Sequence, residues 1–296
     1  MLTLKDLLEK NDVLLSDGAW GTMFIEKGLI AGACPEPWNI DRPDDVYDIA
    51  KQYVEAGSKM VGTNSFGGST FKMSYYGFED KVKEINEMAA KLSRKAMGDN
   101  GIVIGSVGPT GKILMMGDVT EEELYDSFKL QAIALEKGGA NAICIETMSA
   151  IDEAEIAVKA AKENTNLEII TTFSFEKTID NDYKTMMGVD PLTMANAMLN
   201  AGADYIGANC GNGIEDMVEI VKIIRYKYPI VPILVHANAG VPELRNGETF
   251  FPDGPESMSN KVASLIDAGA NMIGGCCGTT PEHIKYINQS IKAICV

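Results

Sequence analysis

Two adjacent cysteines, Cys276 and Cys277, lie among glycines in the stretch IGGCCGTTPEHI at residues 273–284. The backbone freedom of the glycines would allow both sulfur atoms to reach one metal ion. A third cysteine, Cys210, follows another short apolar run. Three thiolates suit Zn²⁺, and three protein ligands with one open position are the pattern of a catalytic zinc site. The cysteines therefore predict such a site, provided that the fold brings Cys210 to the adjacent pair.

Other interpretations of these cysteines stay open. A single buried cysteine commonly packs as a small apolar residue, as we expect for Cys144. A redox pair is disfavoured because Cys276 and Cys277 lack the C-x-x-C spacing. A phosphate-binding loop is the stronger alternative, since the glycine-rich loop leads into a helix with Thr280 as its N-cap and Pro281 at its first position.

Eight short β-rich runs are apolar along nearly their whole length, as strands buried on both faces must be. They occupy residues 12–17, 59–64, 102–107, 142–147, 168–175, 205–210, 232–238 and 271–276. Amphipathic helical stretches separate them. Four joints share one pattern, in which glycine ends a helix before the next strand: EAGSKM, EKGGANAI, NAGADYI and DAGANMI. The repeat predicts a single-domain (β/α)8 TIM barrel over residues 1–296, with a doubly wound open sheet as the alternative.

A barrel predicts the position of the active site, because such sites form at the carboxyl ends of the strands. Cys210 and Cys276 end the sixth and eighth runs, so their sulfur atoms would converge across the seventh. Neither His236 nor His283 is obviously placed to be a fourth ligand. His236 lies one layer deeper on the seventh run, and His283 belongs to the last helix. The residues at the predicted strand ends are Asp17, Asn64, Glu146, Cys210, Asn238 and Cys276.

Composition limits the partners and the location. The chain has 296 residues, a formal charge of −16 and a pI near 4.6, which argues against a nucleic acid or an anionic membrane as partner. No run approaches the roughly 18 apolar residues of a membrane span. The start has no signal-peptide pattern, so we expect a cytoplasmic protein. Its six cysteines are too few for a disulfide scaffold.

The predicted metal centre favours one kind of chemistry. A thiol that entered the open position would lose its proton near neutral pH, because the metal stabilises the thiolate. Three cysteinate ligands give the site a net negative charge, so the metal is a poor Lewis acid and the added sulfur stays nucleophilic. We therefore predict alkylation of a thiol rather than hydrolysis of an ester or peptide.

Seven motifs, in order along nearly the whole chain, resemble the zinc-dependent homocysteine S-methyltransferase family, and most of all the homocysteine-binding module of cobalamin-dependent methionine synthase. The resemblance implies a (β/α)8 barrel that moves a methyl group to the thiol of homocysteine and yields methionine, with Zn²⁺ on Cys210, Cys276 and Cys277. The motifs are DGAWGT at 17–22, TNSFG at 63–67, GPTG at 108–111, IET at 145–147, ANCG at 208–211, NAG at 238–240 and GGCCGTTPEHI at 274–284.

The resemblance also implies roles for residues beside the metal. Asp17 and Glu146 match acidic positions that bind the substrate ammonium group. Asn238 matches a position that supplies an oxygen to zinc when the thiol is absent. On the sequence alone, Asp17 is alternatively a turn residue before a glycine.

Further substrate contacts follow from the same resemblance. Backbone amides around Gly18, Ala19 and Ser65 match the site of the substrate carboxylate. Asn64 is a candidate for substrate binding as well, although simple capping of the strand end explains it equally well.

The methyl donor is the least defined part of the prediction. The chain shows no cobalamin or folate module, so we expect a separate methylated corrinoid protein as donor, with S-methylmethionine and S-adenosylmethionine as alternatives. Betaine is disfavoured. Of three aromatic positions that bind its quaternary ammonium group in betaine enzymes, Trp38 matches one, whereas Gly67 and Thr147 stand where those enzymes have tyrosine.

Two other classes of protein remain as alternatives. A phosphate-handling barrel lyase or isomerase would need a catalytic lysine or an acid–base pair at the mouth, and no lysine ends a predicted strand. A barrel that only binds zinc or a methyl-carrier protein would hold the metal without alkylating a thiol.

Overall fold

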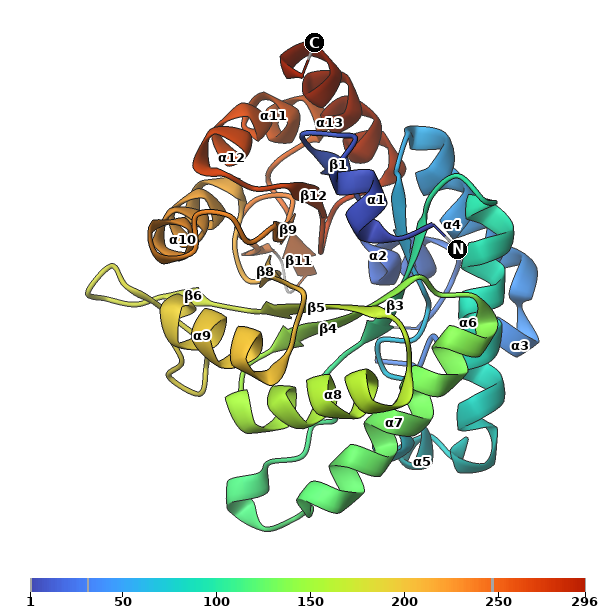
Figure 1. Cartoon of the computed structure of the whole chain (residues 1–296). Coiled ribbons are helices and arrows are strands. Elements are labelled where there is room, and N and C mark those ends of the chain that lie inside the picture. Colours follow the sequence, from blue (N-terminus) through green and yellow to red (C-terminus); the bar gives the residue numbers. More distant parts are fainter. Residues whose placement is uncertain (1, 31, 246–247, 296) are drawn as a thin grey trace.

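Eight parallel strands form one sheet that curls into a barrel (Figure 1). The computed structural model describes residues 2–30, 32–245 and 248–295. The strand order is β1-β12-β9-β8-β5-β4-β3-β2, and its two ends meet where the Lys59 amide donates to the Leu15 carbonyl over 2.8 Å. The predicted barrel is confirmed, and the open sheet is not formed. The strands are Leu14–Leu15 (β1), Met60–Gly62 (β2), Ile102–Val107 (β3), Ala142–Met148 (β4), Glu168–Phe173 (β5), Tyr205–Asn209 (β8), Ile233–Ala237 (β9) and Met272–Gly275 (β12).

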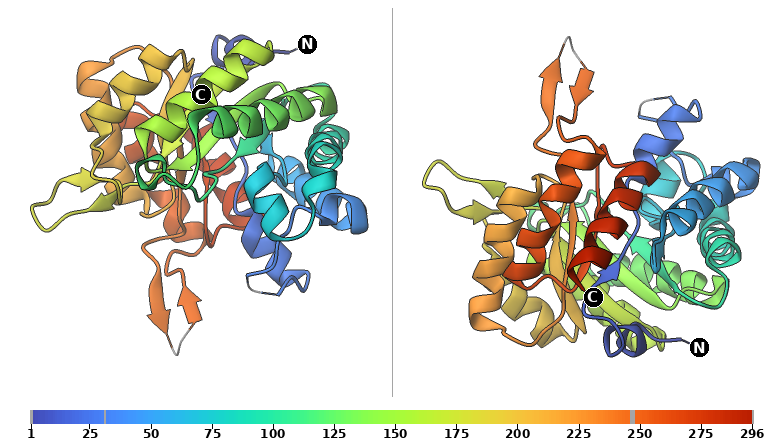
Figure 2. Two further views of the ribbon diagram at one scale, coloured as in Figure 1. Left: turned by 90° about the horizontal axis from the view of Figure 1, so that it is seen from below. Right: turned by 90° about the horizontal axis from the view of Figure 1, so that it is seen from above.

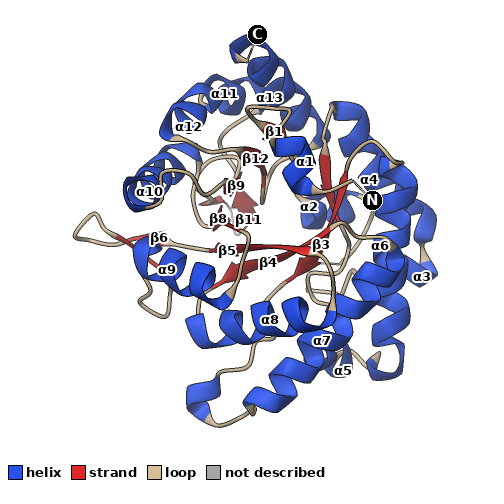
Figure 3. Ribbon diagram, viewed as in Figure 1, coloured by secondary structure: helices blue, strands red, loops and turns tan. Residues whose placement is uncertain are grey.

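Helices surround the barrel on its outer side (Figure 3). Four of them end at a glycine with φ between 102° and 113°, namely Gly57, Gly139, Gly202 and Gly269. This left-handed conformation turns the chain into the next strand, as the repeated joint predicts. The outer helices are Pro43–Ala56 (α4), Val82–Met97 (α6), Glu121–Gly138 (α7), Ile151–Asn164 (α8), Pro191–Ala201 (α9), Ile214–Lys227 (α10), Val262–Ala268 (α12) and Pro281–Ile294 (α13). Shorter helices are Leu4–Leu8 (α1), Trp20–Glu26 (α2), Trp38–Asp41 (α3), Thr70–Tyr75 (α5) and Pro255–Asn260 (α11).

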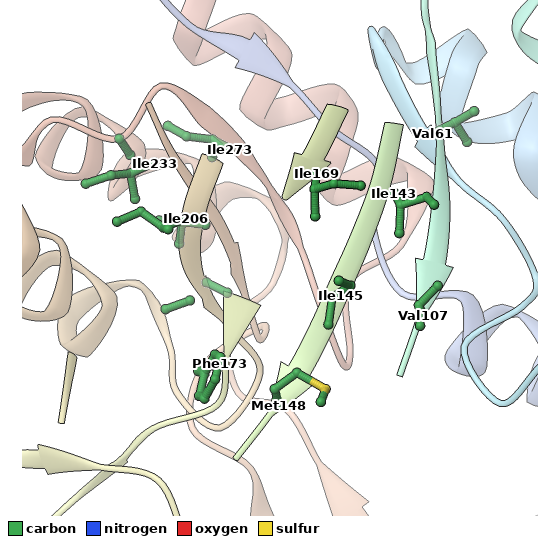
Figure 4. Close-up of a cluster of buried hydrophobic side chains, with 14 of the residues drawn as sticks. Val61, Val107, Ile143, Ile145, Met148, Ile169, Phe173, Ile206, Ile233 and Ile273 are labelled. Carbon is green, nitrogen blue, oxygen red and sulfur yellow. The ribbon is translucent and has the colours of Figure 1, made fainter. Parts of the chain in front are cut away.

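The strands bury side chains on both faces. One face packs against the helices and includes Ile143 and Ile145 of β4 and Ile206 of β8 (Figure 4). The other face fills the barrel interior with a smaller cluster that contains Cys144 and Leu234. Leu4 of α1 belongs to this inner cluster, so α1 packs against the interior at the amino-terminal ends of the strands. The carboxyl ends remain available for a site.

Two hairpins extend the loops at the carboxyl ends of the strands, and the sequence pattern did not indicate either. One follows β5 and pairs Glu176–Lys177 (β6) with Tyr183–Lys184 (β7). The other follows β9 and pairs Glu243–Arg245 (β10) with Glu248–Phe250 (β11). Figure 2 shows both projecting beyond the barrel. Within the described residues, no helix has the length and apolar character needed to cross a bilayer.

Candidate active site

Three cysteines converge at the carboxyl end of the barrel. Cys210 directly follows β8, and Cys276 and Cys277 directly follow β12, with β9 between them. Their sulfur atoms all lie within 4.8 Å of one another, and the Sγ atoms of Cys210 and Cys277 are 3.9 Å apart. Sulfur ligands of a tetrahedral zinc ion, each about 2.3 Å from the metal, are roughly 3.8 Å apart. The donor set therefore fits Zn²⁺ in both type and spacing.

The backbone of β9 holds both strand ends in place. The Cys210 amide donates to the His236 carbonyl over 3.0 Å, and the Cys276 amide donates to the Ala237 carbonyl over 2.7 Å. Cys210 has a φ of 60°, which is uncommon for a residue with a side chain. Such strained residues persist where the surrounding structure fixes them, and they cluster at functional sites.

Asn238 completes the surroundings of the thiols. Its side chain hydrogen-bonds to Cys210 and contributes to lowering the pKa of that thiol, although the bonds from Cys276 and Cys277 have larger effects. Its Oδ1 atom is buried and has no hydrogen-bond partner among the described residues. Buried polar atoms are nearly always paired, so this oxygen is available to a ligand. Coordination of zinc by Asn238 stays a prediction.

Two carboxylates face the same cavity. Asp17 is 4% exposed and accepts hydrogen bonds from Trp20 Nε1 at 2.8 Å and from the Gly62 amide at 2.7 Å. Glu146 accepts a hydrogen bond from the Ser106 hydroxyl. Burial raises the pKa of both groups, that of Glu146 to about 7. A cation bound between them would relieve the cost of keeping both ionised.

The predicted carboxylate-binding segments also line this cavity. The Ala19 amide donates to Thr279 Oγ1 over 3.0 Å, and the Ser65 amide donates to the Thr63 carbonyl over 2.9 Å. The Gly18 amide has no partner among the described residues, which leaves it as the free donor of the three.

Asn64 lines the cavity but is engaged elsewhere. Its Nδ2 donates to the Pro35 carbonyl at 2.8 Å and to Asn39 Oδ1 at 3.0 Å. These bonds tie the loop after β2 to the segment that begins α3. They support a structural role for Asn64. The substrate contact of Asn64 stays a prediction.

The cavity has a volume of about 380 Å³ and contains both the thiols and the carboxylates in its walls. Ile104, Cys144 and His236 also line it, from positions earlier in their strands. Burial lowers the pKa of His236 to about 4, so its imidazole is neutral at pH 7. The sequence indicated the deeper position of His236 but gave it no role.

Sequence reasoning missed two residues that support the carboxylates. Ser106 holds Glu146, and Trp20 holds Asp17. Ser106 is polar within the apolar run IVIGSV, which could have identified it as a residue of the site. Trp20 lies within the motif DGAWGT, but nothing in the motif shows where its indole points.

The loop of the phosphate alternative has the predicted helix start, since Thr280 is the N-cap of α13 and Pro281 its first residue. However, the Thr280 amide donates to His283 Nδ1 over 3.2 Å. The Thr279 hydroxyl donates to the Cys276 carbonyl over 2.7 Å. The Thr280 amide is thus paired within the helix start, and the Thr279 hydroxyl holds the loop at Cys276.

The fold and the site together define a (β/α)8 barrel with a thiol cluster at its mouth. The sequence profile of the homocysteine S-methyltransferase family matches residues 14–291, and the chain belongs to this family. This membership confirms the family resemblance recognised in the sequence.

Curated relatives include two methionine synthases. Those of Mycobacterium leprae and Mycobacterium tuberculosis are each 28% identical, over 302 and 306 residues, which cover 97% and 98% of this chain. The matched part is 25% of each relative. The chain thus spans about a quarter of the length of these relatives.

Among solved structures, the Escherichia coli homocysteine methyltransferase MmuM in its metallated form matches with a TM-score of 0.79 and 21% identity, over 97% of this chain and 99% of that one. The carboxyl transferase domain of Rhizobium etli pyruvate carboxylase has a TM-score of 0.54 at 14% identity, over 97% of this chain and 49% of the other. Both similarities support the barrel fold.

Proposed function

We propose that this protein transfers a methyl group to the thiol of homocysteine and forms methionine, with Zn²⁺ bound by Cys210, Cys276 and Cys277. One observation carries the proposal: a single cavity combines a three-sulfur metal-binding cluster with two buried carboxylates. The metal-binding cluster suits a thiol and the two carboxylates suit an ammonium group, and homocysteine contains both groups.

The residues of the chain divide the work. Zinc held by Cys210, Cys276 and Cys277 would lower the pKa of the substrate thiol and keep its sulfur nucleophilic. Asp17 and Glu146 bind the ammonium group, and the Gly18 amide donates to the carboxylate. Together they fix the amino-acid end of the substrate, so that its thiol points toward the three cysteines. Such positioning is a major source of rate enhancement in a bimolecular transfer.

We further propose a methylated corrinoid protein as the donor, with the whole chain acting as one homocysteine-binding module. The similarity of nearly the whole chain to a quarter of each methionine synthase supports this, because it relates the chain to one part of those relatives. A betaine cage has no support. Gly67 and Thr147 lack aromatic rings, and Trp38 has the Arg42 guanidinium 3.7 Å from its ring centroid.

The test is to incubate the zinc-loaded protein and homocysteine separately with methylcobalamin, S-methylmethionine, S-adenosylmethionine and betaine, and to measure methionine. We expect methylcobalamin to be the productive donor. If methionine formed only from S-methylmethionine or S-adenosylmethionine, that compound rather than a corrinoid would be the donor.

Zinc X-ray absorption with and without homocysteine tests the thiol acceptor independently. We expect one additional sulfur ligand when homocysteine is present. An unchanged zinc environment would contradict thiol activation and favour a barrel that only binds metal.

A further inference from the structure

The proposed function leaves a buried histidine of the cavity, His236, without a role. His236 extends from β9 into the cavity, and its Nε2 atom is buried with no hydrogen-bond partner in the described part of the chain. The cluster of possible metal ligands comprises the three cysteines and does not include His236. Because unpaired buried polar atoms cost free energy, the imidazole is arranged for something other than packing.

Strand register places this imidazole beside β12, on the side of the barrel that Asp17 also occupies. His236 lies opposite Gly274 of β12 and Asn209 of β8. A Cβ atom added at Gly274 would lie 2.8 Å from His236 Cδ2 and 2.6 Å from the Asp17 carbonyl oxygen. The absence of a side chain at Gly274 therefore makes room for the ring on the side of the barrel where Asp17 lies.

We propose that His236 binds the ammonium group of the substrate as a third hydrogen-bond acceptor beside Asp17 and Glu146. An ammonium group has three N–H donors, and a neutral imidazole has one nitrogen that accepts. Asp17 and Glu146 supply two acceptors, and His236 supplies the third from its position within β9. This inference rests on homocysteine as the substrate and deepens it by assigning selectivity for the amino group.

The role predicts discrimination between thiols that differ only in that group. The matching ligand is 4-mercaptobutanoate, which is homocysteine without its amino group. A site that hydrogen-bonds a polar group rejects the analogue lacking it, because its own buried polar atoms are then left unpaired. His236 should therefore contribute to homocysteine binding and not to the binding of 4-mercaptobutanoate.

The experiment measures the dissociation constants of both thiols by calorimetry for zinc-loaded wild-type, His236→Phe and His236→Gln proteins. We expect His236→Phe to bind homocysteine at least about tenfold more weakly, the scale of a hydrogen bond to a charged group, and 4-mercaptobutanoate unchanged. His236→Gln keeps an acceptor and should retain part of the affinity. His236→Leu replaces the phenylalanine variant if that ring does not fit beside Gly274.

Thr171→Val is a matched control, because the Thr171 hydroxyl is also buried without a partner among the described residues but does not line the cavity. It should leave both dissociation constants unchanged. If His236→Phe lost affinity equally for both thiols, or lost none for homocysteine, the role of His236 would be overturned. The proposed substrate would not be affected by that result. A wild-type protein that does not distinguish the two thiols would overturn the ammonium site itself, and with it the proposed substrate.

Discussion

At the scale of single residues, the three thiols are not equivalent. Hydrogen bonds from Cys276 and Cys277 lower the pKa of Cys210, whereas the hydrogen bond to Cys210 raises the pKa of Cys276. Because a thiolate is the form that binds metal, the hydrogen bonds among the three thiols favour an ionised sulfur in the cluster.

Replacing Cys276 by alanine should abolish both zinc retention and methionine formation, because the two remaining thiols cannot fill a site of three protein ligands. Zinc per protein chain, measured by mass spectrometry after dialysis, and methionine production check this. Cys295→Ala is the control, since Cys295 is exposed and lies outside the cluster. A fully active Cys276→Ala protein with bound zinc would refute the assignment.

The raised pKa of Glu146 predicts a pH-dependent cost to folding. The pKa of the Glu146 carboxyl is near the ordinary value of 4.5 in the unfolded chain and about 7 in the folded chain. Stability therefore falls as pH rises from 4.5 to 7, and the full penalty, about 3 kcal/mol, is present above pH 7. Glu146→Gln removes it.

Thermal unfolding of the substrate-free protein from pH 5 to pH 8 measures this effect. As pH rises across this range, we expect the melting temperature of Glu146→Gln to increase relative to that of the wild type. Homocysteine should narrow the difference, because its ammonium group stabilises the ionised carboxylate. If the melting temperatures of the two proteins differed by the same amount at every pH, Glu146 would have an ordinary pKa in the folded state.

At the scale of elements, close approach of neighbouring strands positions the cysteines. A Cβ atom added to Gly207 of β8 would lie 1.9 Å from the Leu234 carbonyl oxygen of β9, and backbone atoms there cannot move without disturbing the ladder. β8 carries Cys210 at its end and β9 anchors both cysteine-bearing loops. The spacing of these two strands therefore determines the geometry of the thiol cluster.

Alanine substitutions at two glycines should change stability in opposite directions. Gly207→Ala forces a steric overlap with backbone and should destabilise the protein by several kcal/mol or prevent folding, since overpacking typically costs about 1–3 kcal/mol even where side chains can adjust. Gly21 lies within α2, and a Cβ there meets nothing within 4 Å. Gly21→Ala should stabilise by about 1 kcal/mol.

Urea unfolding of the two variants, followed by circular dichroism, separates these expectations. Equal midpoints for Gly207→Ala and the wild type would mean that β8 and β9 can move apart without cost.

At the scale of the whole molecule, the hydrophobic core does not depend on the thiol cluster for its packing. Hydrophobic side chains pack both between the sheet and the helices and inside the barrel, whereas the thiol cluster lies at one end. This differs from small zinc domains, in which metal binding supplies the folding free energy. The site is therefore an addition to a stable scaffold.

Removing zinc with a chelator should lower the melting temperature only modestly and leave the far-ultraviolet circular dichroism spectrum unchanged, while methionine formation stops. Adding zinc back should restore activity. Loss of the helical signal on chelation would show instead that the metal is needed for the fold.

The barrel could be predicted from the sequence, because its apolar runs and glycine joints depend on local backbone and burial preferences. The sequence also identified the three cysteines, since their residue type and their positions at predicted strand ends are visible in one dimension. Only the tertiary structure decided what each polar group is free to do. Asn64 and the Ala19 amide have internal partners, whereas the Gly18 amide, Asn238 Oδ1 and His236 Nε2 have none within the described part of the chain. Hydrogen-bond partners come from strands far apart in the chain, so no local pattern could reveal which donors and acceptors remain for a substrate.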